Sequence, residues 1–379
     1  MNIRAIDTLT LKRYPRAANQ RSLQAWDSAD EYLLDAFIEL AIDKEALASG
    51  ELLILNDNFG ALACALVDFL PTCISDSYLS HRATQDNLRS NRLPVDNVTL
   101  LDSLARPTQI PKVVLIKIPK QLALLEDQLA MLSQQVDANT RIIGAGKVTD
   151  IHNSTLKLFD QWLGTTTTSL AKKKSRLIYP QFDANKARNT YSPLVSWSLP
   201  ELGFTIANHA NLFSRGSLDI GARFLLDHIP TGIHGQIIDL GCGNGVLGLT
   251  ALAKNPTAQV TFADESFMAV ASAKLNVAQN LPERLAQTTF WVDNCLEHYP
   301  PQSAELILCN PPFHQNTAIT DHIAKQMFSD AKRCLIAGGE LRIVANRHLS
   351  YFHQLKGLFK TVDTIASNAK FMILSARKG

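Results

Sequence analysis

The residues best suited to carry chemistry form the tetrapeptide Asn310-Pro311-Pro312-Phe313. It follows an apolar run, residues 304–309, that is typical of a buried strand. Because proline has no N–H to donate to a sheet, two consecutive prolines end that strand and open a loop. Ligands of open α/β sheets bind beyond the carboxyl ends of the strands. The sequence therefore predicts a functional loop tip at Asn310.

The same four residues suit the activation of an amino group attached to a planar, conjugated system. Such a group is a poor nucleophile because its lone pair is delocalised. The side-chain carbonyl of Asn310 and the backbone carbonyl of Pro311 could accept its two N–H bonds and leave the lone pair free. The proline pair would keep both acceptors aimed, and Phe313 could stack on a base, a contact worth about 1–3 kcal/mol. His314 is a candidate base, although a surface histidine is the simpler interpretation.

A glycine-rich turn lies roughly seventy residues upstream, where Asp239-Leu240-Gly241-Cys242-Gly243-Asn244-Gly245 follows a β-type strand and precedes a helix. Glycine lets the backbone turn tightly and approach a ligand closely. The spacing of Gly243, Gly245 and Gly248 also matches the dinucleotide fingerprint, so a nicotinamide dehydrogenase is an alternative. Asp264, about twenty residues further on, could bind the ribose hydroxyls of either ligand.

Two features favour S-adenosylmethionine over a nicotinamide cofactor. The carboxylate of Asp239 could face an amino group or, through water, a sulfonium, whereas it would be poorly placed beside a pyrophosphate. A dehydrogenase also has no use for Asn-Pro-Pro-Phe. The sequence therefore predicts a methyl donor bound by the turn and by the acidic residue after it. The cofactor residues expected from this stretch are Asp239, Gly241, Gly243, Asn244, Gly245 and Asp264.

Four further residues are candidates for the cofactor site. The strand expected in residues 290–296 ends near Asp293 and Asn294, either of which could hydrogen-bond the adenine edge. An ordinary turn explains that pair equally well. Phe213 and Asp219 stand just before the core sheet, where a lid or a cofactor contact would lie. The alternatives for these two residues are a core aromatic and a helix cap.

Length and composition limit the class of protein. A chain of 379 residues with 46% hydrophobic and 19% charged residues predicts two globular domains. The chain contains no run of 18 or more apolar residues, so no membrane span is expected. The N-terminus lacks the apolar core of a signal peptide. The six cysteines show no C-x-x-C spacing and the histidines no metal-binding set, which favours reduced thiols, a cytoplasmic location and no metal. The net charge of +2 neither demands nor excludes nucleic acid.

The two halves of the chain show the same order of expected elements. A strand, a turn with one glycine and an apolar helix span residues 51–70, as at 237–254. A strand at 112–118 ends in Ile118-Pro119-Lys120, which stands where the second half has Asn-Pro-Pro-Phe. We interpret this as an internal duplication whose first copy kept the fold and lost the site; two coincidental α/β units are the alternative. The domains expected are 1–185, a support or RNA-binding domain, and 190–379, the catalytic domain.

These residues resemble the two-domain ribosomal RNA guanine-N2 methyltransferases. The resemblance covers nearly the whole chain. The segments that carry it are Leu23-Gln24-Ala25-Trp26-Asp27, Leu53-Ile54-Leu55-Asn56-Asp57, Val114-Leu115-Ile116-Lys117, the glycine turn at 239–245, Cys309-Asn310-Pro311-Pro312-Phe313-His314-Gln315 and Val344-Ala345-Asn346-Arg347-His348-Leu349. The last two segments are the most distinctive, because many methyltransferases share the glycine turn.

The resemblance implies an α/β chain of two tandem Rossmann-like (class I methyltransferase) domains, the N-terminal one degenerate and helping to hold RNA. It implies S-adenosyl-L-methionine as the cofactor and N2-methylguanosine in protein-poor 23S rRNA as the product. The site roles carry over to Asp239, Gly241, Asp264, Asn294 and the tetrapeptide at 310–313.

The Asn-Pro-Pro-aromatic motif alone cannot choose among adenine N6, cytosine N4, glutamine N5 and guanine N2. Three alternatives to the 23S rRNA enzyme therefore stay open. They are a 16S rRNA guanine-N2 methyltransferase, a protein glutamine-N5 methyltransferase and a non-catalytic RNA-binding assembly factor.

Overall fold

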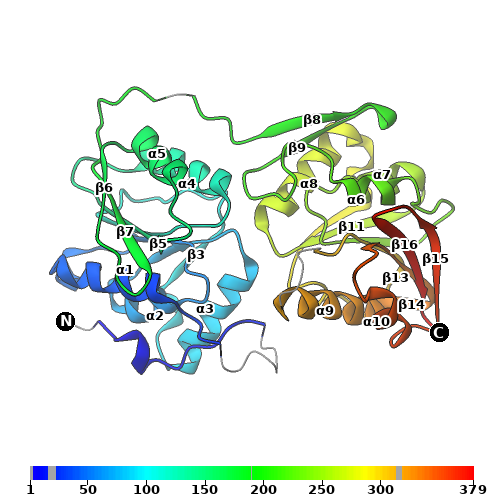
Figure 1. Cartoon of the computed structure of the whole chain (residues 1–379), viewed down its shortest axis with the longest axis horizontal. Coiled ribbons are helices and arrows are strands. Elements are labelled where there is room, and N and C mark those ends of the chain that lie inside the picture. Colours follow the sequence, from blue (N-terminus) through cyan, green and yellow to red (C-terminus); the bar gives the residue numbers. More distant parts are fainter. Residues whose placement is uncertain (1–2, 16–22, 189, 313–317) are drawn as a thin grey trace. The chain divides into compact units, whose positions relative to one another are not determined.

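Each half of the chain folds around its own seven-stranded sheet in the computed structural model, which describes residues 3–15, 23–188, 190–312 and 318–379 (Figure 1). The chain divides into two units, Met1–Pro193 and Leu194–Gly379. Within the described residues, no helix combines the length and apolarity needed to cross a membrane. Each unit is described by itself below.

The sheet of the first unit has the strand order β3-β2-β1-β4-β5-β7-β6, in which β7 is the first antiparallel strand. Helices α1 to α3 pack on one face, and α4 and α5 on the other (Figure 1). The strands are β1 Leu52–Leu55, β2 Thr72–Ile74, β3 Thr99–Leu101, β4 Val113–Lys117, β5 Arg141–Lys147, β6 Thr166–Thr168 and β7 Ser175–Pro180. The helices are α1 Ser28–Glu39, α2 Ala61–Ala65, α3 Tyr78–Ser90, α4 Leu122–Gln135 and α5 Asn153–Trp162.

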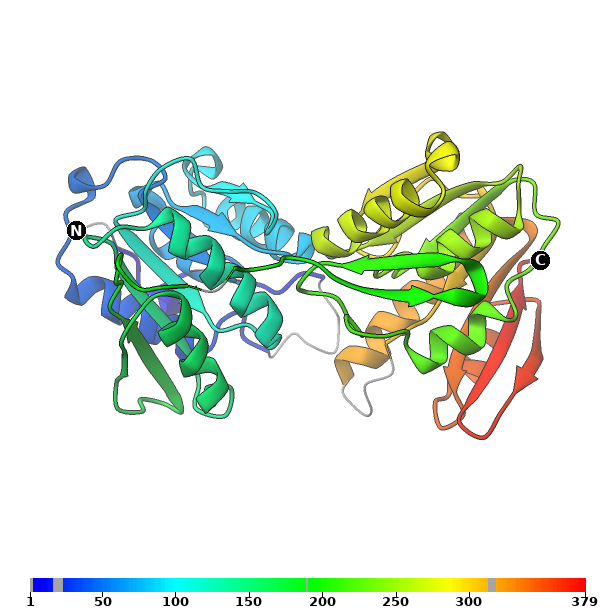
Figure 2. The same ribbon diagram turned by 90° about the horizontal axis from the view of Figure 1, so that it is seen from above.

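The second unit begins with a hairpin, β8 Val195–Leu199 and β9 Phe204–Asn208 (Figure 2). Its main sheet has the order β12-β11-β10-β13-β14-β16-β15. The strands are β10 Gln236–Leu240, β11 Gln259–Asp264, β12 Thr288–Val292, β13 Ala304–Cys309, β14 Leu335–Asn346, β15 Thr361–Ser367 and β16 Phe371–Arg377. The helices are α6 Ile220–Leu226, α7 Val246–Lys254, α8 Phe267–Asn280, α9 Ala318–Cys334 and α10 Tyr351–Lys356.

The two sheets have one topology, since replacing each strand of the first by its counterpart in the second gives the same order. The central strands β1, β4, β10 and β13 are almost wholly buried, because helices cover both faces of each sheet. The predicted α/β architecture of two Rossmann-like domains is therefore confirmed.

The likeness of the two units extends to single hydrogen bonds. The side chain of Asn87 in α3 exchanges two hydrogen bonds with the backbone of Lys12, and that of Asn91, just after α3, does the same with Thr10. In α8, Asn276 and Asn280 hold the backbone of Ala207 and Thr205 in β9 in the same way, at 2.7–2.9 Å. An asparagine side chain offers both a donor and an acceptor, so two of them one turn apart can bind an extended segment as a neighbouring strand would. This shared device supports duplication over coincidence.

Candidate active site

A cavity of about 350 Å³ opens in the second unit at the carboxyl ends of β10, β11 and β13. This is the edge at which ligands of such sheets bind. The structure brings both sequence motifs to this cavity. The sequence-predicted residues that line it are Phe213, Asp219, Gly241, Gly243, Asn244, Asp264, Asn310, Pro311 and Pro312. Phe313 and His314 lie outside the described residues.

The glycine turn uses its glycines for two different purposes. Gly241, Gly243 and Gly245 all have left-handed backbone, with φ of 69°, 53° and 80°. A Cβ built on Gly243 would meet no atom within 4 Å, so its backbone faces open space in the cavity. A Cβ on Gly245 would lie 2.7 Å from the Cβ of Ala273 in α8. Gly245 therefore packs the turn against a helix and does not line the cavity.

We expect Gly245→Ala to lower the free energy of unfolding by about 2–4 kcal/mol, because it combines left-handed strain with overpacking against Ala273. Gly232 provides a matched control, since its φ is 77° but a Cβ there meets nothing within 4 Å. Gly232→Ala should cost only the strain, about 1 kcal/mol. Denaturant titration of both variants measures the difference, and equal losses would mean that the contact with Ala273 is unimportant.

Asp264 ends β11 beside the glycine turn and lines the cavity. Its Oδ2 accepts the N–H of Gly243 at 3.0 Å, and its Oδ1 accepts that of Ser266 at 3.0 Å. Burial raises the pKa of this carboxyl, and the two N–H bonds oppose the shift. An acidic side chain fixed in this way, one strand away from the turn, is suitably placed to bind ribose hydroxyls.

The structure does not bring Asp239 to the cavity. Its carboxyl is fully buried inside β10, where Oδ2 accepts the N–H of Gly248 at 2.8 Å. Oδ1 has no hydrogen-bond partner in the described part of the chain. Burial raises the pKa of Asp239 to about 8, and the nearby Asp264 adds to the shift. The expected anion facing the methyl donor is thus a largely protonated carboxyl that joins the strand to the helix after the turn.

This carboxyl should make stability fall as the pH rises. A group whose pKa is raised from 3.8 to about 8 by folding contributes stability that is fully present below pH 3.8 and is lost as the pH rises through about 8. Asp239→Asn keeps an oxygen for Gly248 but has no proton to lose. We expect its unfolding free energy to change less than that of the wild type between about pH 6 and about pH 9. Parallel curves for the two proteins would show that Asp239 does not titrate in this range.

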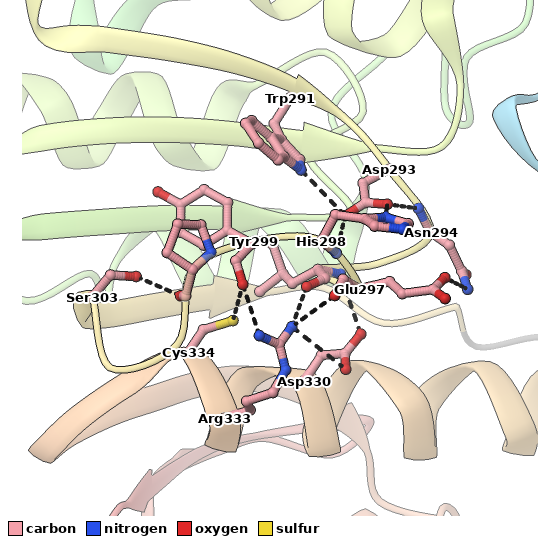
Figure 3. Close-up of polar contacts among 12 residues, drawn as sticks. Trp291, Asp293, Asn294, Glu297, His298, Tyr299, Ser303, Asp330, Arg333 and Cys334 are labelled. Carbon is pink, nitrogen blue, oxygen red and sulfur yellow. Dashed lines mark hydrogen bonds and ion pairs between the residues drawn. The ribbon is translucent and has the colours of Figure 1, made fainter.

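Asp293 and Asn294 follow β12, and neither lines the cavity. Figure 3 shows the carboxylate of Asp293 surrounded by donors: it accepts from Trp291 Nε1, from the backbone of Asn294 and from both the backbone and Nδ1 of His298. The side chain of Asn294 donates to Glu297 at 2.9 Å. The pair therefore closes a loop outside the cavity lining, and the adenine contact expected here stays a prediction.

The same loop brings metal-ligand atoms of Asp293, Glu297 and His298 within 4.8 Å of one another. The donors around Asp293 already account for its burial without an ion. Arg333 of α9 fixes the loop from the other side by donating to the carbonyls of Leu296 and Tyr299 (Figure 3). The arrangement is that of a rigid connection between β12 and β13.

Asn310 follows the end of β13, and only one of the two polar atoms of its side-chain amide has a hydrogen-bond partner in the described part of the chain. Its Nδ2 donates to Oδ2 of Asp219 at 3.1 Å. Its Oδ1 is buried and has no partner among the residues that the structure describes. A buried carbonyl oxygen without a donor costs roughly 1–3 kcal/mol. Asn310 lines the cavity, and its Oδ1 is an acceptor that remains to be satisfied.

Tyr351 of α10 also holds the tetrapeptide in place, which the sequence did not predict. Its hydroxyl donates to the carbonyl of Pro312 at 3.2 Å. Phe328 of α9 packs edge-on against the Tyr351 ring, with centroids 5.2 Å apart. The second proline is thus fixed by a side chain that is itself fixed by packing.

In the first unit, Lys117 occupies the place of Asn310. Leu55 pairs with Ile116 in the first sheet, as Leu240 pairs with Cys309 in the second. The residues that come next, Lys117 and Asn310, are therefore counterparts. The sequence comparison that set Ile118 opposite the asparagine was therefore wrong by one residue. The register of the sheet was needed to see this, because both segments end in a similar proline turn.

Lys117 and its neighbours make internal polar contacts at the strand ends where the second unit has a cavity. Its Nζ lies 2.7 Å from Oδ2 of Asp30 and 3.5 Å from Oδ1 of Asp27. Burial alone would lower the pKa of Lys117, but the two carboxylates outweigh it and raise that pKa. Asn56 replaces Gly241, and its amide bonds the side chain of Gln128. The first unit thus contains an internal ion pair and amide pair in the place of a ligand.

Comparison with known proteins agrees with this division. Residues 3–184 match the family model described as the RLMG N-terminal domain, and residues 203–375 match the methyltransferase small domain. A protein of Klebsiella pneumoniae (strain 342) named ribosomal RNA large subunit methyltransferase G is 54% identical over 98% of this chain and 96% of its own length. A protein of the same name from Erwinia tasmaniensis is 53% identical over 98% and 97%.

A solved structure that is similar to this chain covers both units. It is the Thermus thermophilus 16S rRNA N2 G1207 methyltransferase in complex with AdoMet and guanosine, with a TM-score of 0.73 over 98% of this chain and 95% of the other. The sequences are 19% identical, so the likeness establishes the fold.

Proposed function

Because the chain belongs to the ribosomal RNA large subunit methyltransferase G family, we propose that its second unit transfers a methyl group from S-adenosylmethionine to the N2 amino group of a guanine in 23S rRNA. The observation that carries this proposal is that Asn310, whose buried Oδ1 has no hydrogen-bond partner among the described residues, lines the same cavity as the glycine turn. An acceptor next to a nucleoside-sized cavity suits an amino substrate.

The residues present fit S-adenosylmethionine. The cavity volume of about 350 Å³ lies in the range of small-molecule sites. We propose that the backbone of Gly241, the open backbone of Gly243 and the carboxyl of Asp264 hold the cofactor, with Phe213, 61% exposed, at the cavity wall. Bound there, S-adenosylmethionine supplies an electrophilic methyl group on a sulfonium.

The chain's own contribution is to orient the amino group. Oδ1 of Asn310 and the carbonyl of Pro311 accept hydrogen bonds from the two N–H groups of the target amino group. This turns the nitrogen lone pair out of conjugation with the ring. Because Asp219 and Tyr351 fix the loop, they limit the reorganisation that the acceptors need when the base arrives. Positioning of this kind can account for a large part of a rate enhancement.

The choice of substrate is supported by the family rather than by the motif. The relatives are named for the large ribosomal subunit, and the Thermus structure contains guanosine. We propose protein-poor 23S rRNA as the substrate and the first unit as a support that helps to hold it. An rRNA substrate also makes the cytoplasm the expected location.

Transfer of a labelled methyl group tests the proposal. Purified protein with labelled S-adenosylmethionine should modify naked 23S rRNA in preference to 16S rRNA, assembled large subunits or a glutamine-containing peptide. Mass spectrometry of the digested RNA should identify N2-methylguanosine. Label in the peptide, in 16S rRNA or on another base would replace the proposed substrate by one of the alternatives.

A further inference from the structure

Asp219 makes a contact that a cofactor-binding role does not require. We propose that Asp219 is a positioning residue that fixes the orientation of the Asn310 amide, so that its oxygen and not its nitrogen faces the target amino group. The inference rests on the proposed function, because it assigns Asp219 to the same methyl transfer.

One carboxylate oxygen carries the argument. Oδ2 of Asp219 accepts the N–H of Ala222 at 2.9 Å, which caps α6, and the Nδ2 of Asn310 at 3.1 Å. A carboxylate only accepts hydrogen bonds, so it is satisfied by the NH₂ end of the amide and repels the carbonyl end. The cap therefore fixes the carboxylate, and the carboxylate fixes the amide.

The unpaired Oδ1 of Asn310 follows from this arrangement. With Nδ2 held by Asp219, the carbonyl must point the other way, where the described residues provide no donor. Without Asp219 the amide could turn over and present its NH₂ to the target nitrogen, placing donor against donor. The flipped form would still fit the cavity but would not accept the target N–H bonds.

The first unit places the same two positions together. Asp27 caps α1 by accepting from the backbone of Ala29 at 3.0 Å, as Asp219 caps α6. Its carboxylate lies 3.5 Å from Nζ of Lys117, the counterpart of Asn310. The fold thus sets a helix-capping aspartate opposite the residue at the strand end in both units, and the second unit uses that contact to orient an amide.

Three substitutions separate positioning from helix capping. Asp219→Ala removes the cap and the contact with Asn310. Asp219→Ser keeps an N-cap oxygen, but its hydroxyl is too short to serve both partners. Asp219→Asn keeps a side-chain oxygen able to accept from both Ala222 and Asn310. We expect the alanine and serine variants to lose roughly 10- to 100-fold in kcat, with the Kd for S-adenosylmethionine little changed, and the asparagine variant to recover most of that kcat.

Two results would overturn this inference. Recovery of kcat in Asp219→Ser would show that Asp219 serves only as a helix cap. A loss confined to the Kd for S-adenosylmethionine would make Asp219 a cofactor contact. Crystal structures of the serine and asparagine variants give a readout that does not depend on substrate: Asn310 should lose its fixed orientation in the first and keep it in the second. If the wild type fails to methylate guanine while this structural difference holds, the proposed function fails and the positioning role does not.

Discussion

Replacing Asn310 with alanine should reduce methyl transfer to rRNA by about 100- to 1000-fold while the protein still binds S-adenosylmethionine. The substitution removes the buried Oδ1 that has no partner in the described part of the chain. It leaves the backbone of the glycine turn and Asp264 in place, so the expected cofactor contacts remain. Turnover with labelled cofactor and calorimetric titration measure the two effects separately.

Asn346 provides a matched control for that substitution. It also lies at a strand end, on the neighbouring β14, but it does not line the cavity. Asn346→Ala should keep most of the turnover. Equal losses in the two variants would point to general damage at this edge of the sheet. Loss of cofactor binding in Asn310→Ala would contradict a role confined to the amino group.

Replacing Lys117 with methionine should destabilise the first unit by about 3–5 kcal/mol, because it leaves the carboxyl of Asp30 buried without its partner. The pKa of Asp30 is about 6, raised mainly by burial and lowered in part by Lys117. The defect should therefore shrink in acid, where a protonated Asp30 needs no counter-charge. Denaturant titration gives the size of the loss, and hydrogen exchange should place it in the first unit.

The double variant K117M/D30L tests whether the ion pair itself is responsible. An apolar pair of similar volume removes the unpaired charge, so part of the stability should return. The exposed pair of Lys172 and Asp35, 2.6 Å apart, is the surface control, and Lys172→Met should have little effect. A Lys117→Met protein as stable as the wild type would show that this buried ion pair does not hold the first unit together.

The sequence predicted those parts of the site that depend on local chemistry. An apolar run followed by two prolines placed Asn310 just beyond a strand, and β13 does end at Cys309. The glycine spacing predicted a tight turn, and Gly241, Gly243 and Gly245 all have positive φ. Both signals lie within a few consecutive residues, so no knowledge of the rest of the chain was needed.

The sequence could not show contacts that depend on long-range pairing. The bond from Asn310 to Asp219 joins residues 91 positions apart, and only the packing of α6 against β14 and β16 brings them together. Asp239 and Asp293 were expected at the ligand because each is an acidic residue near a strand end. The structure instead binds one oxygen of Asp239 to the backbone of Gly248 and surrounds the carboxylate of Asp293 with donors from its own loop.

Some of the missed features did leave a signal in the sequence. The asparagine pairs Asn87 and Asn91, and Asn276 and Asn280, recur with the same four-residue spacing in corresponding helices. Polar residues on the buried side of a helix need partners, so this spacing could have indicated the extended segments that they hold. Tyr351 carried no such signal, because a lone tyrosine in a helix is common.

The most direct test of the central claim is a crystal structure of the protein with S-adenosylhomocysteine and a guanine nucleoside. We expect the base in the cavity of the second unit, with its N2 within about 2.6–3.2 Å of both Oδ1 of Asn310 and the carbonyl of Pro311. A base bound with N2 turned away from these two oxygens, or bound outside the cavity, would contradict the account.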